Sequence, residues 1–459
     1  LAILLMMAGA IVLMIMVFTS RWQRRDAQSM GHSMYVVQTM VLFTSNLTFT
    51  IIIPSSYAIA EIMGKDATFS GFLIAANQNG AVVGAALTWL LFQVNPNIWK
   101  SHKVMLAAVG CNIMGAMAFL MILIVTSPTY LKDDAKTWLP WLLCFARLLD
   151  GVGLGIILQF GQMAVVHLFP SSQRPEWMAT NQLFAMLGIG LGPMLASTFG
   201  AVHVCKAAMG HTALGIAYFS ISLGAFLAVS FLYPSSIESN MESYQDMESS
   251  QALQPSPSND QSRDGSEPDS GNRVLLILGA LTMTGTRGAV VSGLEAGTSL
   301  LLEADYNWTK GMIGFAIGAS FLTILPLKFA YNYWQKKLED VTWLRVMALT
   351  AIFGSALLFR SRGIRLLLAD SILFPSIFLG DALTAGLVMM SQNLFPKGSK
   401  LDANHVILYR EVLKGVGRSV GPPLARATVD SAGQMSYAIQ QVGLAILFLV
   451  LLETLVVPN

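Results

Sequence analysis

The stretch GIGLGPMLA at residues 188–196 returns as GRSVGPPLA at residues 417–425, and five of the nine letters coincide. The two copies are 229 positions apart, and both lie in long apolar sequence. The same shift places Gly151 opposite Gly380. A repeat of Gly, Gly-Pro and Ala at one spacing indicates two related halves, so we predict a two-fold internal repeat.

The amino-acid composition indicates that lipid, rather than water, surrounds most of this chain. Of its 459 residues, 54% are hydrophobic and 12% are charged, whereas a soluble domain carries about 25% charged residues. About 20 apolar residues cross a hydrocarbon core roughly 30 Å thick as a helix, which satisfies its own backbone hydrogen bonds. We therefore predict an all-α, multi-pass membrane protein. Thirteen spans are expected, at residues 1–18, 35–59, 71–94, 104–126, 139–168, 176–201, 211–233, 273–302, 309–333, 342–360, 365–395, 404–429 and 434–457.

One long segment breaks the apolar pattern. Residues 234–272 contain eight acidic residues, one Arg and many Ser, Pro and Gln, and such a segment buries too little apolar surface to offset the entropy of ordering. We predict a disordered acidic linker between two six-span bundles, at residues 35–233 and 273–457, with residues 1–18 as an extra N-terminal transmembrane helix. The loops on the linker's side hold eleven Lys and Arg against eight on the other side, which favours a cytoplasmic linker.

Ionisable residues near the middle of the predicted spans are the main functional signal. A charge at the bilayer centre costs about 2.5 to 3.5 kcal/mol, so these side chains must face a cavity or one another. There are eight of them: Arg147, Asp150, Arg287, Glu295, Asp381, Glu411, Lys414 and Arg418. Two pairs, Arg147 with Asp150 and Glu411 with Lys414, are three residues apart on one helix face. Mutual neutralisation inside the bundle therefore stays open as an alternative to a functional role.

Charge and spacing suggest roles for these residues. Arg287 and Arg418 have no acidic residue within one helical turn, so they are the first candidates for binding an anion. The predicted substrate-binding set is completed by Lys414, Arg147, Asn46 and Gln78. The candidates for carrying a coupled proton are Asp150, Glu295, Asp381 and Glu411, because burial disfavours the charged form of a carboxyl group.

The repeated glycine motifs are expected to act in packing. Small residues allow two helices to approach closely, and proline bends a helix. We expect this packing and hinge role for Gly188, Gly192, Pro193, Gly417, Gly421 and Pro422. Direct contact with a substrate is the alternative.

Several motifs resemble those of a known family. The sequence RLLDGVGLG at residues 147–155 matches the R-x-x-x-G-x-G motif of helix 4 in the major facilitator superfamily, and residues 188–196 match its G-x-x-x-G-P-x-x-G motif of helix 5, with Ala196 in place of the last Gly. Residues 45–61 and 303–329 are similar to SPX-type vacuolar phosphate transporters and related lysosomal facilitators, although no SPX domain lies in this chain. The resemblance implies the major facilitator fold, in which pseudo-two-fold symmetry relates two six-helix bundles, here with one extra N-terminal helix.

The resemblance and the charges in mid-membrane together imply secondary active transport. Two halves that rock about a central site would carry a small solute, an anion such as phosphate, by alternating access. Proton coupling is a further expectation. The resemblance implies a vacuolar or lysosomal membrane, with the plasma membrane as the alternative.

Other classes of protein fit the sequence less well. It contains no HExxH, GxSxG or Walker motif and no basic tract interleaved with aromatics, so we expect no enzyme, no cofactor or metal and no nucleic-acid partner. We expect a monomer whose partners are membrane lipid and a small anion. The alternative function is a channel-like or non-transporting protein of the same fold that acts as an anion pore, receptor or scaffold. Such a scaffold would gain nothing from eight intramembrane charges.

Overall fold

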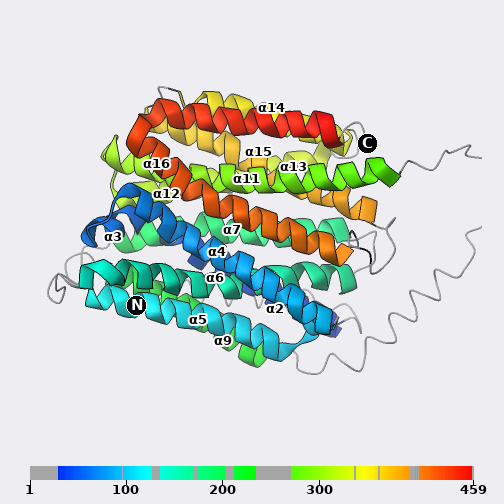
Figure 1. The fold of residues 1–459 in the computed structure, drawn as a ribbon, viewed down its shortest axis with the longest axis horizontal. Helices are drawn as coiled ribbons and strands as arrows, with labels where there is room; N and C mark the ends of the chain where they lie inside the picture. The colour runs from blue at the N-terminus through cyan, green and yellow to red at the C-terminus, as the bar shows by residue number, and fades with distance from the viewer. Residues whose placement is uncertain are drawn as a thin grey trace, which may run out of the picture.

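The computed structural model describes residues 29–95, 97–126, 135–168, 174–201, 211–233, 270–334, 338–359, 362–392, 399, 401 and 403–456. Within these ranges every regular element is helical, and the long helices run along one common direction (Figure 1). The extra helix expected at residues 1–18 lies outside the described residues, as does most of the linker expected at 234–272. The last three residues of that linker, 270–272, belong to a helix instead.

The N-terminal half runs along the length of the bundle six times in the described part of the chain. Its helices are α2 (Ser29–Thr50), continued by η1 (Ile53–Ser55) and α3 (Ser56–Ile62), then α4 (Ala67–Val94), α5 (His102–Val125), α6 (Ala135–Leu168), α7 (Arg174–Ala201) and α9 (Thr212–Leu232). A short η2 (Ile98–Lys100) precedes α5. The α4 helix begins where the Asp66 side chain accepts a hydrogen bond from the Phe69 amide at 2.8 Å, a typical N-cap. Pro54 lies in the break between α2 and α3.

The C-terminal half also runs along the bundle six times in the described part of the chain. Its helices are α11 (Ser270–Ala304), α12 (Lys310–Leu322) followed by α13 (Ile324–Trp334), α14 (Asp340–Ala356), α15 (Gly363–Gln392) and α16 (Ala403–Leu451), which ends in the π-helical turn η3 (Leu452–Val456). The α16 helix holds two crossings, because Gly433 has φ 74° and reverses the chain. Glycine tolerates this left-handed conformation, and the sequence prediction of separate spans at 404–429 and 434–457 agrees with that break.

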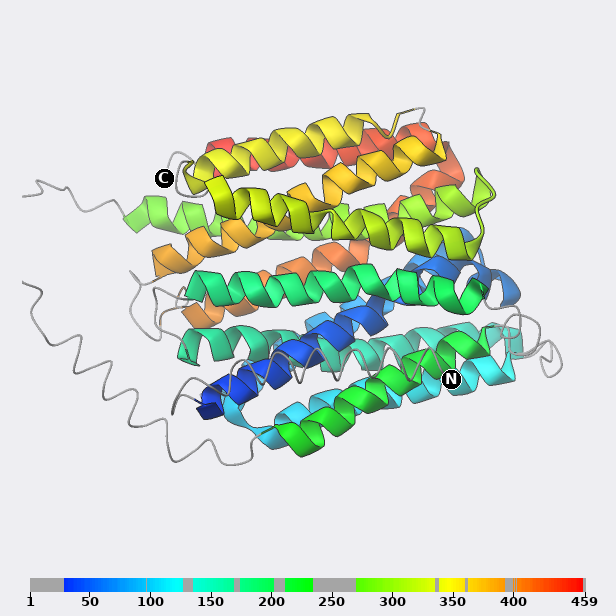
Figure 2. The same cartoon turned by 180° about the vertical axis from the view of Figure 1, so that it is seen from behind.

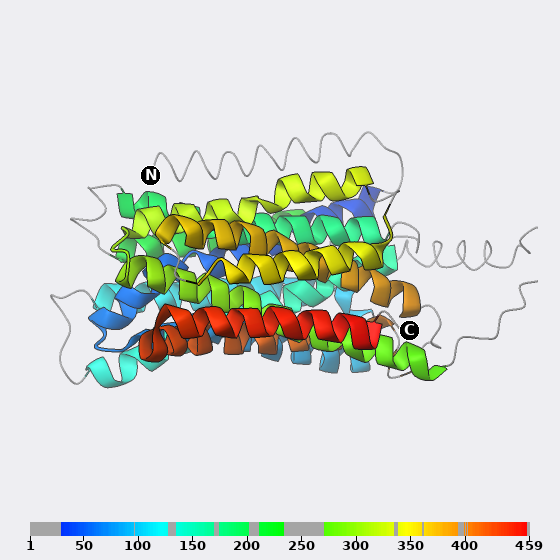
Figure 3. The same ribbon diagram turned by 90° about the horizontal axis from the view of Figure 1, so that it is seen from above.

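The two ends of the bundle are distinct. We call the end that holds the α3–α4 turn and the reversal at Gly433 the α3 end, and the end where α9 finishes and α11 begins the linker end. The α3 end lies on the left in Figure 1, and the rear view in Figure 2 shows it on the right. Figure 3 shows from above that the helices of both halves run from one end to the other.

The repeated glycines pack in the same way in the two halves. A Cβ atom added at Gly192 of α7 would overlap the Thr50 side chain and the Leu47 carbonyl of α2. At Gly421 of α16 it would overlap the Ser292 side chain of α11. The first helix of each half therefore lies against the glycine face of the fifth, which is the contact that a two-fold repeat requires.

The prolines of the same motifs lie at the boundary between the halves. Gly314 of α12 approaches the Pro193 carbonyl so closely that a Cβ would overlap it, and Gly71 of α4 does the same to the backbone at Pro422 and Pro423. One face of each motif therefore packs within its own half, and the opposite face packs against the other half.

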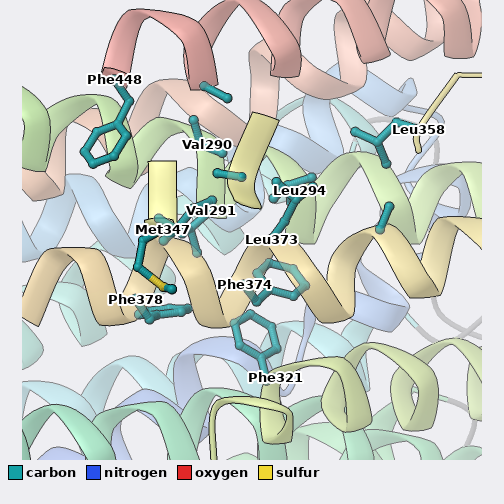
Figure 4. Packing of buried hydrophobic residues seen from close by; sticks show 14 of the residues in the cluster. Val290, Val291, Leu294, Phe321, Met347, Leu358, Leu373, Phe374, Phe378 and Phe448 are labelled. Carbon is teal, nitrogen blue, oxygen red and sulfur yellow. The ribbon is translucent and has the colours of Figure 1, made fainter. Parts of the chain in front are cut away.

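An apolar core fills the C-terminal half. The Phe321 ring of α12 stacks on Phe374 of α15 with centroids 4.0 Å apart, and Leu294 and Leu373 are fully buried nearby (Figure 4). Among the described residues, eight helical stretches are long and apolar enough to cross a membrane. The α4, α7 and α14 helices fall outside that set. The α4 and α7 helices carry buried polar residues, Asn77 and Gln78 in α4 and Asn181 in α7, and α14 has only 17 residues. The predicted all-α, multi-pass membrane architecture is confirmed.

Candidate functional site

A cavity lies between the two halves, lined by several of the polar residues that the sequence singled out. Its polar lining comes from α2, α4 and α7 on one side and from α16 on the other, as Asn46, Gln78, Gln182, Glu411, Lys414 and Arg418. Apolar residues such as Leu154, Ile189 and Phe378 form much of the remaining wall. The cavity volume is about 20 Å³, little more than one water molecule needs. A larger solute therefore requires the halves to move apart.

The charged lining of this cavity comes from one helix face of α16. Glu411, Lys414 and Arg418 follow one another at intervals of three and four residues, which places them on one stripe. The Arg418 Nη2 atom pairs with Glu295 Oε1 of α11 at 2.9 Å, and Glu295 is fully buried behind it. The Lys414 ammonium lies 3.9 Å from Glu411 Oε2. The counter-ion of Arg418 is thus a residue of another helix, which spacing along one helix does not reveal.

One bridge between the halves closes the linker side of the cavity. The Gln162 amide of α6 donates a hydrogen bond to Glu411 Oε1 at 2.6 Å. Glu411 therefore has a closer partner in the N-terminal half than Lys414 on its own helix. Separation of the halves at the linker end must break this bond.

A second bridge closes the α3 side. Arg426 of α16 is 1% exposed, and its guanidinium donates to the hydroxyls of Ser56 and Ser70 in the N-terminal half. It also donates to Ser299 Oγ at 3.1 Å and to the Ala296 carbonyl at 3.2 Å in α11. We call Arg426, Ser56, Ser70 and Ser299 the Arg426 cluster. Because its members come from both halves, the cluster joins the halves at the α3 end.

The first predicted pair lies away from the cavity, inside the N-terminal half. Arg147 and Asp150 are 0% and 1% exposed and lie 3.4 Å apart. The Asp150 carboxylate accepts hydrogen bonds from Asn77 at 2.5 Å and Asn112 at 2.8 Å, while Arg147 donates to the Tyr218 hydroxyl at 3.0 Å. Arg147 also donates to the carbonyls of Thr48 and Phe49. This arrangement is the mutual neutralisation that the sequence left open.

Arg287 and Asp381 also lie away from the cavity, inside the C-terminal half. Arg410 pairs with Asp381 Oδ2 at 2.8 Å, and Arg287 lies 4.0 Å from Oδ1. Arg287 donates to Thr384 Oγ1 at 2.6 Å and stacks over the Phe448 ring at 4.2 Å. A separate, largely apolar cavity adjoins Arg287 and Phe448. Of the predicted substrate-binding residues, the central cavity therefore brings together Asn46, Gln78, Lys414 and Arg418, and leaves Arg147 and Arg287 elsewhere.

Sequence reasoning overlooked three buried charges because it searched only the middle of each span. Asp370, Arg410 and Arg426 are at most 7% exposed, yet they fall near the ends of the predicted spans 365–395 and 404–429. A search of whole spans for ionisable residues would have found them. Within the described residues, no group of three or more His, Cys, Asp or Glu could hold a metal ion.

Solved structures share this architecture over nearly the whole chain. The human organic anion transporter MFSD10 (TETRAN) superposes with a TM-score of 0.60 at 17% identity, covering 92% of this chain and 99% of that one. The xylose transporter XylE from E. coli, in a partially occluded inward-open conformation, gives 0.67 at 14% identity, with 92% and 97% covered. No protein-family model matches the sequence, and no curated protein sequence matches it. At these identities the likeness shows the fold, and the predicted major facilitator fold is confirmed.

Proposed function

We propose that this protein is a secondary active transporter that carries a small anion by alternating access. The observation that carries the proposal is the position of Lys414. Its ammonium lines the cavity between the halves, and its ion-pair partner, Glu411, is 3.9 Å away and held more closely by Gln162. An anion that enters the cavity can take the place of that weak partner.

The charge balance of the cavity favours entry of a proton with the anion. Within the group of four formed by Lys414, Arg418 and their ion-pair partners Glu411 and Glu295 the charges balance, so an added anion leaves this group with one negative charge in excess. A net charge away from water is costly. Protonation of Glu411 removes that excess and frees Lys414 for the substrate. We therefore propose Glu411 as the coupling carboxylate among the four that the sequence suggested.

The two bridges between the halves support the alternating cycle. The Gln162–Glu411 bond closes the linker end and the Arg426 cluster closes the α3 end. Opening one end while the other stays closed exposes the cavity to one side at a time. The excess of Lys and Arg favours the linker end as the cytoplasmic one, and the resemblance to vacuolar and lysosomal facilitators supports an organelle membrane.

Uptake into proteoliposomes tests this function. Labelled phosphate, chloride and xylose are offered with and without a pH gradient that is acidic outside the vesicles, and exchange against unlabelled solute is followed separately. We expect phosphate uptake that saturates and rises with the gradient. Lys414→Gln should reduce it at least about tenfold, the loss of about 1.4 kcal/mol of binding, while the exposed Arg345→Gln serves as control.

The outcomes separate the competing functions. Glu411→Gln should retain phosphate exchange and lose the response to the gradient. Anion flux that does not saturate and shows no accelerated exchange would identify an anion pore. Uptake of xylose but not of phosphate or chloride would show that the substrate is a sugar. Unchanged uptake in Lys414→Gln and Arg418→Gln would show that the cavity is not the binding site. A loss of uptake in Arg287→Gln as large as in Lys414→Gln would show that Arg287 also binds the substrate.

A further inference from the structure

One buried carboxyl group lies outside the cavity and outside every ion pair described above. Asp370 is fully buried in α15, seven residues after the helix begins at Gly363, so it lies about 10 Å from the α3 end at 1.5 Å per residue. Its Oδ1 atom accepts a hydrogen bond from the Thr298 hydroxyl at 3.3 Å. Its Oδ2 atom has no hydrogen-bond partner in the described part of the chain.

The surroundings of Asp370 contain no counter-charge among the described residues. No Lys, Arg or His side chain there forms an ion pair with it. The titratable group beside it is Tyr437 of α16. From α12 the Ser320 hydroxyl contacts the neighbouring Ser371 at 3.2 Å. The other buried carboxylates differ, because each has an Arg or Lys partner: Asp150, Glu295, Asp381 and Glu411.

A buried carboxyl group without a counter-charge is stable only in its neutral form, because an unpaired charge in an apolar environment takes up a proton instead. The place for that proton is Oδ2, the oxygen that lacks a partner. We propose that Asp370 is a proton-binding site that is occupied while the α3 end is closed and that releases its proton to water when that end opens. The proposal rests on the alternating-access function, since it needs a state in which the α3 end is open.

The hydrogen bonds around Asp370 connect it to closure of the α3 end. Thr298, which donates to Asp370, is followed in α11 by Ser299, which accepts from Arg426 at 3.1 Å. A movement of α11 would therefore change the contacts of both Asp370 and the Arg426 cluster. An ionised Asp370 needs water around it, and water reaches this depth only if the helices at the α3 end separate. Low pH should accordingly favour the closed α3 end, and high pH the open one.

Two measurements that need no transported solute test this proposal. Spin labels at Lys65→Cys and Ser431→Cys, on exposed or half-exposed positions of the two halves at the α3 end, report its opening after Cys111, Cys144 and Cys205 are replaced by Ser. Infrared spectroscopy of the same protein detects the carbonyl band of a protonated carboxyl group. Glu339→Gln removes an exposed acidic residue and serves as the matched control.

We expect the label distance of the parent protein to lengthen as pH rises, and the protonated-carboxyl band to weaken in step. Asp370→Asn, which resembles the protonated acid, should lack that band and keep the short distance at every pH. Thr298→Val should keep the band and shift the midpoint of opening by roughly one pH unit, since a hydrogen bond to a carboxyl group is lost.

Two results would overturn the proposal. A carboxyl band that persists unchanged in Asp370→Asn would show that Asp370 is not the protonated group. Opening with the same pH dependence in Asp370→Asn and the parent protein would show that this group does not control the α3 end. If the parent protein transports no phosphate while its label distance and infrared band change together with pH as expected, the failure belongs to the transport function and not to the proton site.

Discussion

All the buried charge described above in the N-terminal half is enclosed away from the cavity, whereas the C-terminal half also presents charged residues to the cavity. Arg147 and Asp150 are surrounded by Asn77, Asn112 and Tyr218 of their own half, and the N-terminal residues of the cavity wall are neutral amides. In the C-terminal half, Lys414 and Arg418 face the cavity. The two halves thus share the packing of their glycine motifs, but the N-terminal half lines the cavity with neutral amides and the C-terminal half lines it with charged side chains.

The largest expected effect tests the enclosed pair. Arg147→Met leaves Asp150 without a cation at a site that is 1% exposed, and breaking a buried pair from one side costs about 3 to 5 kcal/mol. We expect a marked fall in the thermal unfolding temperature in detergent, with little folded protein to assay. The double variant Arg147→Met/Asp150→Leu should recover part of the loss, because it removes the unpaired charge.

The control for this experiment is the exposed pair on the surface. Arg345 and Glu453 lie 2.6 Å apart but are 43% and 40% exposed, so Arg345→Met should change the unfolding temperature little. If Arg147→Met unfolds at the parent temperature and abolishes phosphate binding instead, Arg147 would belong to the substrate site and the contrast between the halves would be wrong.

More of the fold than of the candidate site could be predicted from the sequence. Apolar runs and the shared glycine motif are local patterns, and lipid leaves a helix few alternatives, so thirteen spans were predicted from them, of which the first lies outside the described residues. The site depends on which way each helix faces. Spacing along one helix places Glu411, Lys414 and Arg418 on a common stripe, but it does not reveal that Arg418 pairs with Glu295, 123 positions away. The positions of Arg147 and Arg287 away from the cavity are likewise decided by contacts between helices.

The next effect in size concerns the two ends of the bundle. Ser70→Ala removes one hydrogen bond from the Arg426 guanidinium at the α3 end, and Gln162→Ala removes one from Glu411 at the linker end. A hydrogen bond to a charged group contributes about 1.5 to 3 kcal/mol, so each change should shift the balance between open ends by roughly 10- to 100-fold.

The two variants should act in opposite directions. Spin labels at the α3 end should move apart in Ser70→Ala and stay close in Gln162→Ala. Ser220→Ala, an exposed serine that bonds only within its own helix in the described structure, should leave the distances unchanged. Opening of the same end in both variants would mean that the bridges do not alternate.

A smaller effect tests the packing repeat itself. Gly192→Val and Gly421→Val both force a side chain into a contact that already lacks room for a Cβ, and overpacking costs about 1 to 3 kcal/mol. We expect similar losses of stability in the two halves, measured by thermal unfolding. Gly224→Val, which has open space around it, should cost much less. A loss confined to one half would contradict the equivalence of the two motifs.

The smallest effect separates the neutral wall from the charged one. Gln182 lines the cavity from α7 and carries no charge, so Gln182→Ala removes at most a neutral hydrogen bond to the solute, about 0.5 to 1.5 kcal/mol. We expect the KM for phosphate to rise about two- to tenfold with an unaltered response to the pH gradient. Lys414→Gln, in contrast, should weaken binding more, and Glu411→Gln should remove the response. A Gln182→Ala protein that loses the response to the pH gradient would show that the N-terminal wall also takes part in proton coupling. The contrast between a neutral N-terminal wall and a charged C-terminal wall would then fail at the cavity, even if Arg147 and Asp150 are enclosed as described.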